Sequence, residues 1–269
     1  MQIHQIGGFM NQKMKTAPAA ENKMGTMPIG KLLFNMSLPM MISMLVQALY
    51  NIVDSIFVSR IDENALTAVS LAFPLQTLMI ALGTGTGVGI NALLSKSLGE
   101  KDFDKADKTA ENGVFLALIN YVVFCLIGIF LTKPFYLSQT RDPQIIEYGV
   151  QYLRIVCCCS FGMYAQFVFE RLLQSTGKTV YTMITQSLGA VINIVLDPIF
   201  IFGLQMGMRG AALATIIGQI VSFCISLRYM FHFKTIRLTK ESFHMTGRHI
   251  ENIFKFGASA CFNQIAMTI

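Results

Sequence analysis

Long apolar stretches alternate with short polar breaks along most of the chain. The apolar stretches cover residues 35–59, 68–95, 114–132, 148–169, 179–203 and 211–231. Each is long enough to cross a hydrocarbon core about 30 Å thick as a helix, which takes about 20 residues. The breaks are charged or rich in Pro, Gly and small polar residues, which end helices. The pattern predicts an all-α, polytopic membrane protein with six transmembrane helices.

The two ends of the chain and one inner connection differ from this pattern. Residues 1–28 are polar and lack the apolar core and cleavage site of a secretory leader, so we predict a disordered tail. Residues 29–231 form the predicted six-helix lobe, and 232–252 are a longer polar loop between lobes. Residues 253–269 are apolar apart from Lys255 and begin with a weak echo of residues 33–37. Because transporters often contain such repeats, we expect the start of helix 7 of a truncated second lobe.

Composition supports a membrane protein over a soluble one. The chain is 53% hydrophobic and 13% charged, whereas a soluble domain has about 25% charged residues. If the N-terminus is cytoplasmic, 16 of the 21 Lys and Arg residues lie inside and 5 outside. This distribution follows the positive-inside rule, so the net charge of +6 reports topology and gives little support to nucleic-acid binding.

Two acidic residues lie well inside apolar stretches, Asp54 and Asp197, while the others fall in loops or, like Glu170, at a membrane boundary. A carboxylate in the bilayer core costs about 2.5 kcal/mol or more, which makes it a candidate functional group. Asp54 precedes Ser59 by five residues and Asp197 precedes Gly203 by six. Both acids would therefore lie roughly 7–9 Å below the outer surface. A carboxylate that only joins helices is the alternative interpretation.

Polar partners accompany both acids at helical spacing. Tyr50 precedes Asp54 by four residues, and Asn193 precedes Asp197 by four, so each pair shares a helix face. Thr215, on the sixth helix, reaches a similar depth. Neutral and acidic oxygens of this kind suit a hard cation, so we predict a sodium or proton site formed by Asp54, Asp197, Asn193 and Thr215 with Tyr50 beside them.

Pro198 follows Asp197 directly and is the predicted gating residue. Its ring removes a backbone donor and frees the carbonyl of Ile194, which allows the helix to bend. Bending beside a buried acid is a feature of the broken helices of transporters. A proline merely tolerated near the helix end is the alternative.

The sequence offers no catalytic or cofactor motif. The glycine run 83–89 lacks the Lys-Ser/Thr ending of a phosphate loop, and the six cysteines have no metal-ligand spacing. An intramembrane aspartyl protease also uses two aspartates, but its Tyr-Asp and Gly-x-Gly-Asp signatures are absent: Val53 precedes Asp54 and Leu196 precedes Asp197. We therefore expect a protein that is not an enzyme and holds no cofactor.

Two segments carry a family resemblance: 188–203 with 210–215, and 50–58 with Pro39. Together with Leu173-Gln174-Ser175-Thr176-Gly177, they resemble the multidrug and toxic compound extrusion (MATE) transporters, in particular the bacterial branch similar to DinF and MepA. The resemblance implies one lobe of a twelve-helix exporter in the bacterial cell membrane. Such an exporter expels cationic or amphipathic drugs in exchange for sodium ions or protons. The cation-site residues of that branch match Asp54, Asp197, Asn193, Tyr50 and Thr215.

Two further functions stay open at this point. A flippase for lipid-linked precursors in the same superfamily would need a strongly cationic cavity, and the apolar stretches hold almost no Lys or Arg. A fragment that does not transport is the other possibility, because the C-terminal lobe is missing from the expected pair.

Overall fold

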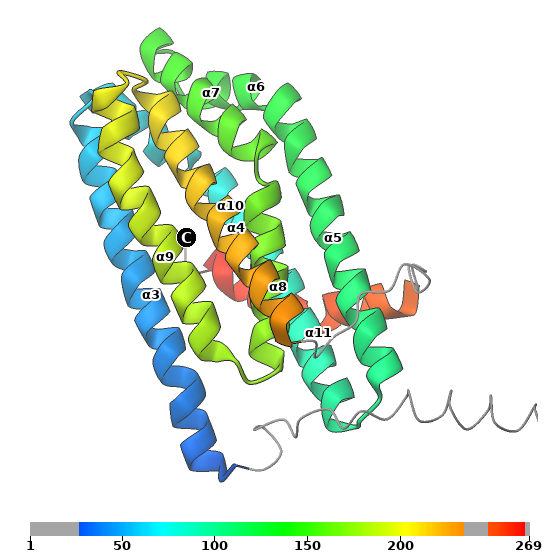
Figure 1. Ribbon diagram of the computed structural model, residues 1–269. Helices are drawn as coiled ribbons and strands as arrows, with labels where there is room; N and C mark the ends of the chain where they lie inside the picture. Colours follow the sequence, from blue (N-terminus) through cyan, green and yellow to red (C-terminus); the bar gives the residue numbers. More distant parts are fainter. Residues whose placement is uncertain (1–26, 234–246, 267–269) are drawn as a thin grey trace, which may run out of the picture.

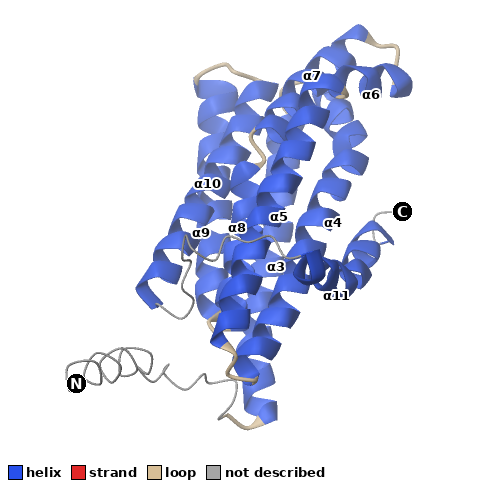
Figure 2. Cartoon of the chain, turned by 90° about the vertical axis from the view of Figure 1, so that its right-hand side faces the viewer, coloured by secondary structure: helices blue, strands red, loops and turns tan. Residues whose placement is uncertain are grey.

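The computed structural model describes residues 27–233 and 247–266 and forms one bundle of helices (Figure 1). Most of the predicted tail and interlobe loop fall outside these residues. Within them the chain is helical and contains no strand (Figure 2). The helices are α3 (Ile29–Ser59), α4 (Glu63–Gly99), α5 (Phe103–Phe130), α6 (Thr132–Gln139), α7 (Pro143–Cys158), α8 (Phe161–Ser175), α9 (Thr179–Pro198), the π-helical η1 (Ile199–Gly203), α10 (Met208–Phe233) and α11 (Gly247–Ala266). The predicted all-α membrane fold is confirmed.

Five helical segments of the described chain are long and apolar enough to cross a membrane by themselves. They are α3, α4, α5, α9 continued by η1, and α10. The pair α7 and α8 makes a sixth crossing if it counts as one span. The segment 179–203, predicted as one span, matches α9 with η1 residue for residue.

The predicted fourth span, 148–169, does not form one continuous helix. It is divided between α7 and α8, which are bent by 45° at a short break. At the break, the Ser160 hydroxyl donates to the Cys157 carbonyl at 2.8 Å. A serine that bonds a nearby carbonyl competes with regular helical bonding. The pair also starts earlier than predicted, at Pro143, because the Asp142 carboxylate caps the backbone N–H groups of Gln144 and Ile145.

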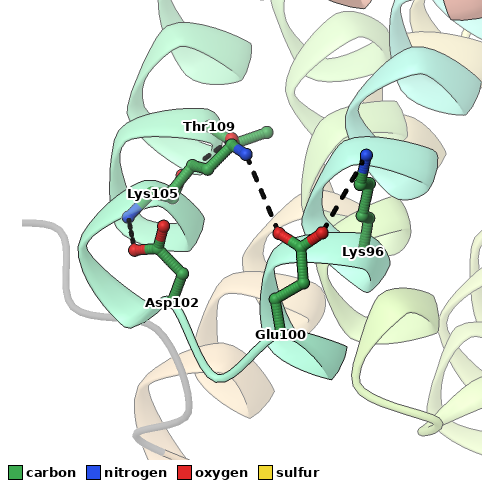
Figure 3. Close-up of polar contacts among 5 residues, drawn as sticks. All are labelled: Lys96, Glu100, Asp102, Lys105 and Thr109. Atoms are coloured by element: carbon green, nitrogen blue, oxygen red, sulfur yellow. Dashed lines mark hydrogen bonds and ion pairs between the residues drawn. The ribbon is translucent and has the colours of Figure 1, made fainter.

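The charged segment 96–111, predicted as a break, is mostly helical. Asp102 caps α5 by accepting from the backbone N–H of Lys105 at 3.1 Å. Lys101 makes the turn in the left-handed region, with φ of 59°. Glu100 lies between Lys96 and Lys105, at 3.9 and 3.8 Å (Figure 3). The apolar pattern underestimated the lengths of α4 and α5, because the polar ends of these helices are set by caps and ion pairs.

The arrangement of α3, α9 and α10 positions the candidate site. α9 lies between α3 and α10 (Figure 1). Gly189 on α9 and Gly218 on α10 meet closely: a Cβ added to Gly218 would lie 2.8 Å from the Gly189 carbonyl oxygen. Small residues allow membrane helices to approach in this way. On the far side, α3 buries only Pro39, Ser43 and Val58 and exposes apolar residues such as Leu33 and Met44.

α11 begins at Gly247, six residues before the predicted start of the seventh helix. It lies beside α4, as Figure 2 shows. A Cβ at Gly89 would collide with the Ile253 carbonyl, and one at Gly257 with the Gly85 carbonyl. The glycine run of α4 is therefore a helix-packing surface, in agreement with the absence of the Lys-Ser/Thr ending of a phosphate loop.

Candidate cation site

The five predicted site residues come together from three helices. Tyr50 and Asp54 lie on α3, Asn193 and Asp197 on α9, and Thr215 on α10. Asp197 is fully buried and Asn193 is 3% exposed, while Tyr50, Asp54 and Thr215 are half-buried. The sequence predicted their common depth, and the packing of α9 between α3 and α10 supplies their lateral proximity.

Asn193 joins the two sides of the site. With the amide oriented to suit its neighbours, Nδ2 donates to Asp197 Oδ2 at 2.8 Å. Oδ1 then accepts from the backbone N–H of Thr215 at 3.0 Å and lies 3.3 Å from its hydroxyl. The close contact of Gly189 with Gly218 one turn deeper makes this bridge possible. Asn193 therefore presents its donor to the acid and its oxygen to α10.

The two acids face each other across α3 and α9. The carboxyl groups of Asp54 and Asp197 lie within hydrogen-bonding distance of each other. In a low-dielectric interior two carboxylates at such a distance repel strongly, so a shared proton or a bound cation is needed to hold them together. Oδ1 of each acid is buried and has no hydrogen-bond partner among the described residues. These two oxygens are available to a ligand.

Tyr50 and Thr215 complete the set of oxygens. The Tyr50 hydroxyl is hydrogen-bonded to the Thr215 side chain and lies near both acids. Carboxylate, hydroxyl and phenol oxygens suit sodium or a proton. Among the described residues, no group of three or more His, Cys, Asp or Glu side chains could hold a metal ion. That these oxygens bind sodium or a proton stays a prediction.

Pro198 ends α9 and begins a wider turn directly after Asp197. Residues 199–203 form the π-helical η1, which is closed by the Leu204 N–H donating to the Ile199 carbonyl at 2.8 Å. Single π-helical turns frequently occur at functional sites. Phe202 of η1 contacts Phe57 of α3 edge to face, with ring centroids 6.4 Å apart. A change in this turn would act on both helices that carry the acids; the gating role itself stays a prediction.

Two residues beside the pair, Tyr152 and Gln76, were not predicted from the sequence. Tyr152 of α7 is 5% exposed and lies near Asp54 and Tyr50. Its hydroxyl accepts from Gln76 Nε2 of α4 at 3.0 Å. An amide inside an apolar span is the only signal in the sequence, and it gives no indication of which helix it faces.

Glu170 is also more buried than its predicted place at a membrane boundary suggests. Its side chain is 2% exposed and is held between α8 and α9. Besides the Asp54–Asp197 pair, the described part of the structure therefore buries two further acids, Glu170 and Glu111 of α5, which is 3% exposed.

The chain is similar to bacterial drug exporters over nearly its whole length. It is 28% identical over 246 residues to the multidrug export protein MepA of Staphylococcus haemolyticus, covering 90% of this chain and 54% of the relative. It is 26% identical to MepA of Staphylococcus aureus strain MRSA252, with 89% and 54% covered. The chain spans about half the length of the curated relatives it matches.

Solved structures give the same result. An outward-facing multidrug resistance MATE family transporter of the MOP superfamily is 30% identical, with a TM-score of 0.83, over 88% of this chain and 53% of that one. The family model MatE matches residues 39–199, more than half of the chain and including both Asp54 and Asp197. The all-helical lobe described above, with its acids in the membrane, belongs to the MatE family.

Proposed function

We propose that this chain is the cation-coupling lobe of a secondary active transporter. In this proposal the transporter exports cationic or amphipathic drugs across the bacterial cell membrane in exchange for sodium ions or protons. The single observation that carries the proposal is the contact between Asp54 and Asp197, held by Asn193 and Thr215 in the membrane-spanning bundle. No catalytic group is needed for this activity.

The pair provides a physical basis for coupling. With no cation bound, charge repulsion favours separation of α3 and α9, and a proton or sodium ion removes that repulsion. A ligand shifts a conformational equilibrium only through its different affinity for the two states. Here the affinity depends on whether the two carboxyl groups are together, so cation binding and helix position are linked. Pro198 and η1 would allow the outer end of α9 to respond.

The donor set leaves the choice of ion open. Asn193 turns its Nδ2 toward Asp197, an orientation that stabilises a carboxylate and suits a proton shared with Asp54. Sodium would draw on the free Oδ1 atoms of both acids and on the hydroxyl groups of Thr215 and Tyr50. Comparing dye efflux driven by a sodium gradient with efflux driven by a pH gradient in proteoliposomes separates the two.

Drugs are the proposed cargo because the relatives that the chain matches are multidrug export proteins. Since the chain spans about half of their length, the proposed partner is a second lobe, and the drug would bind in a protein of full family length. The transport experiment therefore uses such a protein, with this chain as its first lobe.

Replacing Asp197 by Asn tests the proposal in that protein. We expect gradient-driven efflux to fall roughly 5- to 150-fold, the range of a coupling free energy of about 1–3 kcal/mol. The fall should occur because the amide of Asn is always neutral, so it has no negative charge for a proton or sodium ion to neutralise. Asp104→Asn is the matched control, since Asp104 is exposed in the first turn of α5. Unchanged efflux and unchanged ion dependence in Asp197→Asn would contradict the proposal.

A further inference from the structure

A second polar cluster surrounds Glu170 at the other end of α9. Gln186 of α9, which contacts Glu170, precedes Asp197 by 11 positions in the sequence, or roughly 16 Å along a helix. The Glu170 side chain is 2% exposed and comes from α8. The cluster is therefore separate from the Asp54–Asp197 pair, although the same helix contributes to both.

The Glu170 carboxylate is held by neutral donors. Gln166 Nε2 donates to Oε1 at 2.8 Å, and Gln186 Nε2 donates to Oε2 at 2.7 Å. The Thr185 hydroxyl lies 3.5 Å from Oε1. A buried acid in a membrane protein is expensive and is usually functional. Partners that are amides rather than cations make this acid unusual, because a buried carboxylate is generally paired with a positive charge.

Primary amides suit both protonation states of a carboxyl group. A carboxylate takes N–H donors, as here, whereas a protonated acid donates to an amide oxygen after the amide turns by 180°. An arginine in the same place would fix the ionised form. Sodium fits less well, because both amide nitrogens face the acid and both would have to turn. The chemistry of the cluster therefore favours a proton that binds and leaves.

The charged neighbour of Glu170 is Arg171, the next residue on α8, which acts on it electrostatically. The Arg171 guanidinium donates to Gln174 Oε1 at 2.7 Å, and its stem packs against Gly87 of α4. On the α9 side Thr182, Thr185 and Gln186 are neutral, and on the α10 side Ser222 donates to the Thr185 carbonyl at 3.0 Å. Arg171 favours the ionised acid through its charge, but its guanidinium hydrogen bond goes to Gln174.

The contact between α9 and α10 continues this polar surface. Asn193 meets Thr215, Gly189 meets Gly218, Thr185 meets Ser222 and Tyr181 meets Tyr229. Ser226 lies one turn below Ser222 on the same face of α10. Its hydroxyl is buried and has no hydrogen-bond partner among the described residues. The glycine contact separates this region from the acidic pair.

We infer that Glu170, with Gln166, Gln186 and Thr185, is a second proton-binding site, distinct from Asp54 and Asp197 and separated from them by the Gly189–Gly218 contact. Its role in transport rests on the proposed function, whereas its titration does not. Protonation neutralises the carboxylate that accepts the hydrogen bond from Gln186. The hydrogen bond that joins α8 to α9 therefore changes when Glu170 takes up a proton.

Infrared difference spectroscopy tests the site directly. A transporter of full family length that contains this chain is reconstituted in lipid, and spectra at low and high pH are subtracted to find the carbonyl bands of protonated, buried carboxyl groups. We expect Glu170→Gln to remove one band and Asp197→Asn to remove a different one. Glu147→Gln, at an exposed glutamate on α7, is the control and should remove none.

Two results would overturn the inference. Spectra of Glu170→Gln that keep every buried carboxyl band of the wild type would mean that Glu170 does not take up a proton. Gln186→Met, which keeps Glu170 but removes a partner, should shift the frequency of the Glu170 band, and an unshifted band would exclude the site described. Failure of the proposed function appears separately, as unchanged efflux in Asp197→Asn, whatever the infrared spectra show.

Discussion

At the scale of single residues, Asn193 and the glycines beside it determine how closely the acids are held. Asn193 bonds Asp197 and Thr215 at once, which is possible only because α9 and α10 approach at Gly189 and Gly218. A side chain at either glycine would separate the helices. The geometry of the site therefore depends on residues that carry no chemistry themselves.

Gly218→Ala tests this dependence. The new Cβ would lie 2.8 Å from the Gly189 carbonyl oxygen, which belongs to the backbone and cannot rotate away. Overpacking of this kind costs about 1–3 kcal/mol, so we expect a lower Tm in detergent and weaker cation binding. Gly99→Ala is the control, because a Cβ there meets nothing within 4 Å. An equal Tm for Gly218→Ala and wild type would show that the contact tolerates separation.

Single residues also mark the limit of what the sequence could predict. The i, i+4 spacing of Tyr50 with Asp54 and of Asn193 with Asp197 was sufficient to place each pair on one face. Neither the contact of Tyr152 with Gln76 nor the polar cluster around Glu170 could be predicted in this way. Both depend on which helices pack together and in which register, and helical periodicity carries no information about either. The cation-binding role of the five residues stays a prediction.

At the scale of elements, α9 with η1 is the segment on which both buried sites depend. Its inner half contacts Glu170 through Gln186, and its outer half carries Asp197 and then Pro198. The sequence predicted the limits of this span correctly because the stretch is mainly apolar and follows the break Ser175-Thr176-Gly177. The break between α7 and α8 was missed because residues 148–169 are also apolar, and the bend results from local bonding at Ser160.

Pro198→Ala tests whether the end of α9 acts as a gate. Alanine restores a backbone donor for the Ile194 carbonyl and favours a continuous α-helix, so we expect a higher Tm and slower gradient-driven efflux. Pro143→Ala is the control, since a proline in the first turn of α7 removes no helical bond. A Pro198→Ala transporter as fast as the wild type would leave the proline with a structural role only.

At the scale of the whole molecule, the distribution of charge predicts how the bundle sits in the membrane. The start of α3 and the turn between α4 and α5 lie at one end of the bundle, and α6 and α7 meet at the other (Figure 1). The first end carries Lys96, Lys101 and Lys105, which predicts that it faces the cytoplasm.

Thiol labelling of intact cells measures this orientation. Arg141→Cys, exposed between α6 and α7, should react with a membrane-impermeant reagent, whereas Asp104→Cys, exposed at the start of α5, should react only after lysis. Replacing the exposed Cys159 and Cys224 by Ser lowers the background. Labelling of Asp104→Cys but not Arg141→Cys in intact cells would reverse the predicted topology.

The close contact of α11 with α4 has a mechanical consequence. The backbones of the two helices touch at Gly89 with Ile253 and at Gly85 with Gly257. Residues 253–257 are therefore packed firmly against this lobe. If the proposed second lobe rotates as a rigid body relative to this bundle, its pivot must lie after Gly257. The inner half of α4, which contacts residues 253–257, would then bear the torque.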